Sequence, residues 1–353
     1  MHDLIIIGAG PAGIALAVEA RVWGFDPAGT LVLEKSAGHN ATIRHLYPEH
    51  KLTTANYKGF AARCEGRLCI DDMSKGDTLA YFDRVIDEHG VRIQYGAEVH
   101  AIRLIDASAT TRFRVESSTG SYEAAVLAVA IGIFGRPNKP SGYRLPAGLK
   151  DRILFGIASA RVVNEHVLVV GGGDTAAEYA ECLHRAGNRV TLSYRGSRFA
   201  RLNGRNHAMM LSLGNGGDIE ILLESNIDRI DVDAGRPQVV FREKERYPAR
   251  AFDRVVYALG GTTPTNFLRG LGIDFDDQGP IVREGGETNV PGLFLLGDLV
   301  VGRAGGSINT ACNSAVRAMR RIAEQFRPEP LDLAVDPPAP SLQDQPEHDC
   351  RAI

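Results

Sequence analysis

Two glycine-rich turns constrain the fold of this chain more than any other feature. The first occupies residues 8–13 and the second residues 171–176, and each follows a short run of apolar, mostly β-branched residues. Each turn is followed by apolar residues at helical spacing. A buried strand, a turn of small residues and a helix begin a βαβ unit, in which the backbone approaches a pyrophosphate at the helix N-terminus. The sequence therefore predicts two dinucleotide-binding units.

The end of the next strand distinguishes the two units. In the first unit it carries Glu34, about 20 residues beyond Gly13, where a carboxylate accepts hydrogen bonds from a ribose diol. In the second unit it carries no acid and leads to Arg195 and Arg198. Arginine binds a 2′-phosphate through charge-assisted hydrogen bonds, so the second unit favours NADPH over NADH. The alternative is that these arginines only solvate an exposed loop.

The two halves of the chain repeat beyond the glycine turns. Residues 99–102 resemble residues 227–230, and residues 125–132 resemble residues 253–260, both at an offset of 128 positions (227 − 99 and 253 − 125). A shared offset across two features indicates an internal duplication. Each half is predicted to be a βαβ unit, a meander of strands and a short apolar strand that ends in glycine.

A third apolar strand, at residues 293–296, returns the chain to the first unit. It leads to Gly297 and Asp298 and is followed by a helical pattern over residues 308–326. The remainder is rich in proline and aspartate and is predicted to be disordered. The chain is therefore divided into a first domain of residues 1–142 and 287–326, an inserted domain of residues 143–286, and a tail of residues 327–353.

Composition and charge exclude several classes of protein. The 353 residues carry a net charge of −3, which gives no indication of nucleic-acid or anionic-membrane binding. The first apolar run stops at a glycine, and no apolar stretch is long enough to span a bilayer. The five cysteines do not form the framework of a secreted protein, and the histidines show no metal-ligand spacing. A cytoplasmic protein without a metal site is expected.

These features resemble the low-molecular-weight thioredoxin reductase-like flavoproteins, which belong to the two-dinucleotide-binding disulfide oxidoreductases. The resemblance covers roughly residues 3–326, and its most specific motif is Val-Pro-Gly-Leu-Phe-Leu-Leu-Gly-Asp at residues 290–298. It implies an α/β fold of two Rossmann-like domains, each with a β-meander, the first binding FAD and the second NADPH. It also implies a homodimer in which the nicotinamide domain rotates about connectors near residues 137–146 and 285–291.

The same resemblance implies the cofactor-binding residues. Asp298 is expected to bind the FAD ribityl chain, and the helix after it is expected to point its N-terminus at the flavin pyrimidine. The FAD residues implied are Gly8, Gly10, Pro11, Ala12, Gly13, Glu34, Val99, Ala130, Gly132, Gly297 and Asp298. The NADPH residues implied are Gly171, Gly173, Asp174, Thr175, Ala176, Arg195, Arg198 and Gly260.

The cysteines depart from the pattern of this family. Thioredoxin reductases of this type carry Cys-x-x-Cys just before the second glycine turn, whereas residues 155–160 contain no cysteine. A different pair, Cys64 and Cys69, lies in a segment that passes the flavin ring in the family. We expect either a redox pair that accepts electrons from reduced FAD, with Arg63 and Arg67 favouring the thiolate, or two unrelated half-buried cysteines.

Four other side chains are candidates for chemistry. Cys312 is placed early in the helix that faces the flavin, where a helix N-terminus lowers a thiol pKa, although a buried small side chain is an equal alternative. His39, His45 and His50 fall in the flavin-side segment, either as acids and bases or as solvated loop residues.

The leading hypothesis is an FAD-dependent oxidoreductase that takes hydride from NADPH and passes electrons to a disulfide or thiol-type acceptor, small molecule or protein, through Cys64 and Cys69. The first alternative is electron transfer to ferredoxin or flavodoxin, because relatives without the cysteines reduce such carriers. The second is a redox sensor, or a flavoprotein with a second FAD in the Gly171 site.

Overall fold

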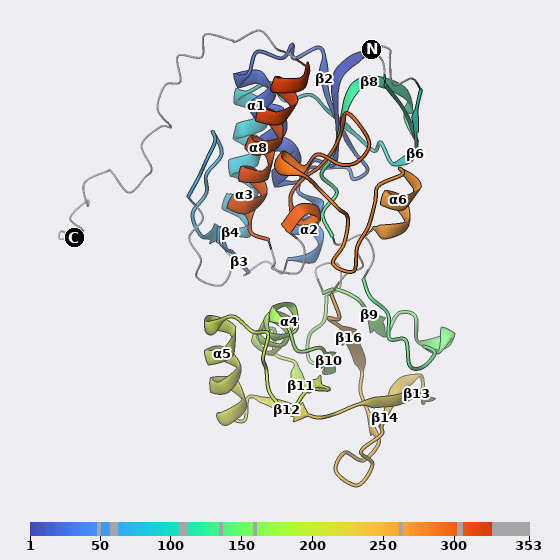
Figure 1. The fold of residues 1–353 in the computed structure, drawn as a ribbon. Coiled ribbons are helices and arrows are strands. Elements are labelled where there is room, and N and C mark those ends of the chain that lie inside the picture. The colour runs from blue at the N-terminus through green and yellow to red at the C-terminus, as the bar shows by residue number, and fades with distance from the viewer. Residues whose placement is uncertain are drawn as a thin grey trace, which may run out of the picture.

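The computed structural model describes residues 1–47, 51–56, 63–105, 112–133, 137–157, 161–260, 264–301 and 306–326. These residues form two α/β domains, seen one above the other in Figure 1. The predicted pair of Rossmann-like domains is therefore confirmed. The predicted disordered tail and His50 lie outside the described residues.

The first domain is built on a seven-stranded sheet. Its order is β5-β2-β1-β8-β7-β6, and β17 pairs with β8 beside this path. The strand β8 changes partner along its length, since its first half pairs antiparallel with β7 and its second half parallel with β1 and β17. The strands are β1 (His2–Ile7), β2 (Thr30–Glu34), β5 (Ile93–Tyr95), β6 (Val99–Leu104), β7 (Phe113–Ser117), β8 (Gly120–Val129) and β17 (Leu293–Leu295).

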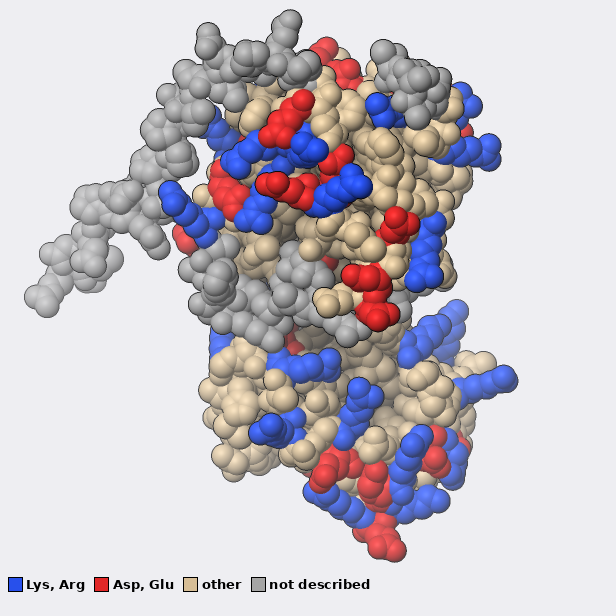
Figure 2. All heavy atoms as spheres, in the orientation of Figure 1, with Lys and Arg blue, Asp and Glu red and all other residues tan. Residues whose placement is uncertain are grey.

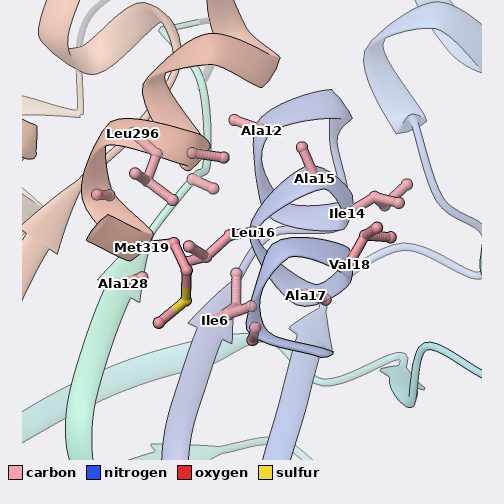
Figure 3. Packing of buried hydrophobic residues seen from close by; sticks show 14 of the residues in the cluster. Ile6, Ala12, Ile14, Ala15, Leu16, Ala17, Val18, Ala128, Leu296 and Met319 are labelled. Carbon is pink, nitrogen blue, oxygen red and sulfur yellow. The ribbon is translucent and has the colours of Figure 1, made fainter. Parts of the chain in front are cut away.

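Three helices cover one face of this sheet: α1 (Pro11–Val22), α3 (Lys75–Glu88) and α8 (Ile308–Phe326). Figure 3 shows Leu16 of α1 beside Met319 of α8, above Ile6 of β1. All three side chains are fully buried in one apolar cluster. Residues from both ends of the chain thus form a single core.

The second domain contains a five-stranded parallel sheet of order β12-β11-β10-β16-β9. A three-stranded antiparallel meander, β13-β14-β15, follows it. The elements are β9 (Ile153–Leu154), β10 (His166–Val170), α4 (Asp174–Arg185), β11 (Arg189–Tyr194), α5 (Gly204–Asn215), β12 (Ile219–Leu223), β13 (Ile227–Asp233), β14 (Arg236–Phe241), β15 (Arg250–Ala251) and β16 (Arg254–Tyr257). The strands of each sheet come from the residues that the sequence assigned to that domain. The exact domain boundaries at residues 142 and 286 stay predictions.

The predicted duplication extends to irregular details of the backbone. The first meander strand of each domain breaks register at the same place, between Val99 and Ala101 in β6 and between Ile227 and Arg229 in β13. The first glycine of each turn has a positive φ. A Cβ added there would lie 2.6 Å from the Ala130 carbonyl oxygen in the first domain and 2.5 Å from the Ala258 carbonyl oxygen in the second. Only glycine is tolerated at such a position.

The remaining elements are short. They are α2 (Ala41–Leu46), β3 (Leu52–Thr53), β4 (Met73–Ser74), η1 (Ala147–Leu149), α6 (Thr265–Gly270), η2 (Glu284–Gly286) and α7 (Asp298–Val301). Within the described part of the chain, no helix is long and apolar enough to cross a membrane. Figure 2 shows acidic and basic side chains mixed over the visible face. Among the ion pairs of α8, Arg317 bonds to Glu65 and Arg321 to Glu287.

Candidate active site

One large cavity lies at the junction of the two domains. Its volume is about 1700 Å³, which exceeds the roughly 300–1,000 Å³ of an ordinary small-molecule pocket. Gly10, Glu34 and Asp298 line it from the first domain, and Asp174 and Arg205 line it from the second. The cavity therefore has room for more than one ligand and is bounded by the helix that follows each glycine turn.

The first turn leaves backbone donors facing this cavity. Gly10 is the N-cap of α1 and gives no side-chain hydrogen bond, while Pro11 begins the helix. Free N–H groups at a helix N-terminus attract anions such as pyrophosphate. A Cβ added at Gly10 would meet only the Ala130 carbonyl oxygen, at 3.9 Å, and would otherwise project into open space. A Cβ at Gly13 would instead collide with the Gly8 carbonyl oxygen, so that glycine allows the helix to pack against the turn.

Glu34 is held in place by backbone donors. Its two carboxylate oxygens accept hydrogen bonds from Ala9 N and Ser36 N, each at 2.8 Å. The side chain is 6% exposed and lines the cavity. A carboxylate offers about four lone-pair sites. Glu34 therefore keeps acceptor capacity for a ribose diol.

Two side-chain oxygen groups on the cavity, the Asp298 carboxylate and Asn40 Oδ1, lack hydrogen-bond partners among the described residues. The carboxylate of Asp298 lines the cavity, and burial raises its pKa. The Oδ1 atom of Asn40 is buried without a partner, on a residue with a left-handed φ of 52°. Buried polar groups are normally hydrogen-bonded. Both positions thus fit a ligand rich in hydroxyl groups, which is a property of FAD.

The N-terminus of α8 closes the cavity on the same side as Asp298. Ser307, Ile308 and Ala311 line it, and the Ser307 hydroxyl accepts a hydrogen bond from Thr310 N at 3.1 Å. The positive end of the helix dipole stabilises negative charge at this position. Of the other predicted FAD residues, all but Gly13 also line the cavity, namely Gly8, Pro11, Ala12, Val99, Ala130, Gly132 and Gly297.

The second turn is arranged differently. Of the predicted NADPH residues only Asp174 lines the cavity. Its Oδ1 atom accepts hydrogen bonds from Asn203 N at 2.8 Å and from Asn206 Nδ2 at 2.9 Å. The Tyr194 ring covers the middle glycine of the turn, where an added Cβ would collide with it. The remaining predicted residues, Gly171, Gly173, Thr175, Ala176, Arg195, Arg198 and Gly260, lie off the cavity.

The two arginines stand at the surface beyond β11. Arg195 and Arg198 are both exposed, and neither forms an ion pair with another described residue. Their guanidinium groups are thus accessible to an anionic ligand that extends from the second turn.

Several lining residues carry no sequence signal of their own. Lys51 forms an ion pair with Glu178 of α4 at 2.7 Å, and its ammonium lies 3.7 Å from the centre of the Tyr47 ring. The Tyr179 hydroxyl donates to the Leu46 carbonyl oxygen at 3.3 Å. The Lys51–Glu178 ion pair and the Tyr179–Leu46 hydrogen bond join the two domains at the edge of the cavity. They could not be read from the sequence because more than 100 residues separate the partners.

The structure joins Cys64 and Cys69 in a disulfide, with their Cα atoms 5.7 Å apart. Cys69 is exposed and Cys64 half-buried. Neither residue lines the cavity. The loop that carries them hydrogen-bonds to Asn309 and Asn313 of α8 and to Glu19 of α1. The disulfide thus lies off the cavity, and a redox pair at these positions stays a prediction.

Of the two alternatives for Cys312, its surroundings favour the buried small side chain. Its side chain is 1% exposed and belongs to the core between α1 and α8. Burial raises the pKa of the thiol to about 12, with Glu19 adding to the effect. A neutral, inaccessible thiol is neither a nucleophile nor a redox centre.

Replacing Cys312 by alanine should therefore leave turnover unchanged and lower the free energy of unfolding by about 1–2 kcal/mol, through lost packing. Steady-state kinetics and urea unfolding measure the two effects. A large loss of turnover in a variant with near-native stability would contradict the assignment of Cys312 to the core.

The histidines do not reach the cavity either. His39 is buried, with Nε2 2.7 Å from an Asp83 carboxylate oxygen, and burial lowers the pKa of its imidazole. His45 is exposed on α2. Neither described histidine lines the cavity, so the interpretation of these two as acids or bases is not supported.

Comparisons with known proteins agree with this geometry. The sequence model of the family described as pyridine nucleotide-disulphide oxidoreductase matches residues 5–297. A ferredoxin–NADP reductase from Ignicoccus hospitalis is 27% identical over 316 residues, covering 85% of this chain and 90% of that protein. A thioredoxin reductase from Mycolicibacterium smegmatis is 26% identical over 333 residues, covering 92% and 98%.

Solved structures share the fold. The bacillithiol disulfide reductase from Staphylococcus aureus aligns with a TM-score of 0.79 at 21% identity, covering 92% of this chain and 99% of that one. The thioredoxin reductase from Lactococcus lactis aligns with a TM-score of 0.72 at 22% identity, covering 92% and 98%.

Proposed function

The chain belongs to the pyridine nucleotide-disulphide oxidoreductase family, and on this premise we propose that it takes hydride from NADPH onto FAD and passes the electrons directly to an external acceptor. The observation that supports this best is the large cavity at the domain junction. Helices that follow both glycine turns contribute to it, and no described cysteine lies on it.

The first-domain residues would hold FAD. The N–H groups at the start of α1 would bind the pyrophosphate, Glu34 the adenosine ribose, and Asp298 and Asn40 the hydroxyl groups of the ribityl chain. FAD supplies a carrier that accepts a hydride and releases electrons singly or in pairs. The Ser307 end of α8 would stabilise the negative charge of the reduced state through its dipole.

The second-domain residues would hold NADPH. The start of α4, whose N-cap Gly173 gives no side-chain hydrogen bond, is suited to the pyrophosphate. Arg195 and Arg198 are suited to the 2′-phosphate. Because Gly173, Arg195 and Arg198 lie off the cavity, hydride transfer requires the second domain to move, and the Lys51–Glu178 pair would have to open.

Two classes of acceptor fit direct transfer. A disulfide or thiol-type compound, small molecule or protein, accords with the family and with the relative named thioredoxin reductase. A ferredoxin or flavodoxin accords with the relative named ferredoxin–NADP reductase. Direct transfer serves both classes, because neither requires an internal dithiol at the flavin.

A Cys64→Ser/Cys69→Ser variant tests direct transfer. With FAD at saturation, NADPH-dependent reduction of ferredoxin, flavodoxin and a disulfide such as DTNB is expected to be unchanged per bound flavin, in stopped-flow and steady-state assays. Cys182→Ser is the matched control. If flavin bleaching by NADPH persists but the acceptor is no longer reduced, the two cysteines are a relay and direct transfer fails.

The stoichiometry of FAD tests the proposal as a whole. One FAD per chain, bleached by NADPH without oxygen, is expected. Two FADs per chain would favour a second flavin in the Gly171 site, and absence of bleaching would favour a redox sensor. We further propose a cytoplasmic homodimer, supported by the cysteine usage and by the resemblance to thioredoxin reductase-like proteins. Sedimentation of the holoenzyme measures its oligomeric state.

A further inference from the structure

The disulfide between Cys64 and Cys69 closes a loop, residues 63–72, that is packed between α1, α3 and α8. We propose that this disulfide is a second redox site, which an external dithiol reduces, and that its state controls the wall of the FAD cavity and hence FAD affinity. The inference rests on the proposed function only in naming FAD as the ligand of the cavity.

The disulfide is accessible from solvent and separate from the cavity. Cys69 is exposed, and neither cysteine lines the cavity. The adjacent Arg63 and Arg67 are also exposed, and basic neighbours favour a thiolate leaving group. A dithiol from solvent therefore reaches Cys69 without entering the cavity.

Two buried asparagines of α8 hold the loop on either side of the disulfide. Asn313 accepts from Glu65 N at 3.0 Å and donates to the Arg63 carbonyl oxygen at 2.8 Å. Asn309 accepts from Ile70 N at 3.0 Å and donates to the Ile70 carbonyl oxygen at 2.9 Å. The loop thus hydrogen-bonds to α8 at both of its ends.

The loop also satisfies a buried carboxylate of α1. Arg67 N donates to Glu19 Oε1 at 2.8 Å, and Glu19 is 4% exposed. Gly66 lies so close to Glu19 and Val316 that a Cβ there would collide with both side chains. A loop displaced from this position would leave Glu19 without that donor, which is costly for a buried carboxylate.

Contacts from the loop reach the cavity wall. Asp72 accepts a hydrogen bond from Ala55 N at 2.8 Å, and Asn309 N donates to the Ala55 carbonyl oxygen at 3.2 Å. Ala55, Asp72 and Ile308, which adjoins Asn309, all line the cavity. The position of the loop therefore determines where this part of the wall lies.

The reduction is a thiol–disulfide exchange. One thiolate of the dithiol attacks Cys69 Sγ, the Cys64–Cys69 bond breaks, and Cys64 leaves as a thiolate that takes up a proton. The second thiol of the dithiol then displaces Cys69. The external dithiol is oxidised to its disulfide, and two electrons and two protons pass to the two cysteines. The opened loop gains conformational freedom that the disulfide had removed.

Two measurements on the wild-type protein test the inference. Dithiothreitol and a reduced thioredoxin, at equal dithiol concentrations, are applied to the protein, and alkylation followed by mass spectrometry reports the state of each cysteine. Titration of apoprotein with FAD, followed by flavin fluorescence, gives the dissociation constant in both states. Reduction is expected to modify Cys64 and Cys69 and to weaken FAD binding about fivefold or more. Re-oxidation should restore the affinity.

Control variants make the result specific. Cys64→Ser/Cys69→Ser should bind FAD with the weaker affinity whether or not dithiol is added, and Cys182→Ser should respond like wild type. Equal FAD affinity in the oxidised and reduced wild type would overturn the inference while leaving the proposed function intact. Failure to bind FAD in either state would instead contradict the proposed function. The two dithiols distinguish a small-molecule reductant from a protein one.

Discussion

A Gly10→Val variant is expected to fold and to purify without FAD. The backbone at Gly10 is extended rather than left-handed, and a Cβ there projects into the cavity without striking protein atoms. The isopropyl group would occupy the space above the N–H groups of α1 where the pyrophosphate is expected to bind. FAD content and NADPH oxidation should both fall below detection. Flavin absorbance and circular dichroism measure cofactor content and fold.

Gly148→Val is the matched control, because a Cβ at Gly148 meets no atom within 4 Å and Gly148 does not line the cavity. It should retain full FAD. Normal FAD content in Gly10→Val would show that the pyrophosphate does not rest on α1, and the assignment of the first glycine turn would fail. Unfolding of Gly10→Val but not of Gly148→Val would show that Gly10 has a role in folding that its surroundings do not reveal.

The second large effect is expected from Arg195→Ala/Arg198→Ala. Each charge-assisted hydrogen bond to a phosphate contributes about 1.5–3 kcal/mol, so loss of both should raise the KM for NADPH by about 100-fold or more. The KM for NADH should change little, because NADH has no 2′-phosphate. Steady-state kinetics with both nucleotides give the ratio directly.

Arg229→Ala is a suitable control for this pair. Arg229 is an exposed arginine of the same domain whose ion pairs with Asp228 and Asp231 lie at the surface and stabilise little. It should leave both KM values unchanged. If the Arg195→Ala/Arg198→Ala variant has KM values for NADPH and NADH that are raised equally, the two side chains contribute to packing or general charge. They would then not select the 2′-phosphate.

The sequence predicted the parts of the fold that local pattern determines. Apolar runs beside glycine turns, together with the repeated offset, were enough to predict both domains and the return of residues 293–326 to the first. Glu34 and Asp298 were predicted because each lies at or just beyond the carboxyl end of a strand, where parallel sheets bind ligands. Such positions depend on spacing along the chain and not on distant partners.

The sequence could not predict features that distant residues determine. The spacing of Cys64 and Cys69 is compatible with a disulfide, but the side of the domain on which it lies is fixed by Asn309 and Asn313, more than 200 residues later. Cys312 follows the start of a helix, yet its angle around that helix turns it into the core. Asn40 lines the cavity in a left-handed backbone conformation, which no sequence motif predicts.

The strand β17 and helix α8 have a consequence for synthesis on the ribosome. The strands of the second domain lie in one uninterrupted stretch of chain, between residues 153 and 257, whereas the first domain needs residues 293–326 for an edge of its sheet and a layer of its core. The second domain can thus complete its sheet first, although its sequence begins later. Until translation passes α8, the nascent first domain exposes the apolar surface of α1. It acquires a complete FAD cavity only when α8 has left the ribosome.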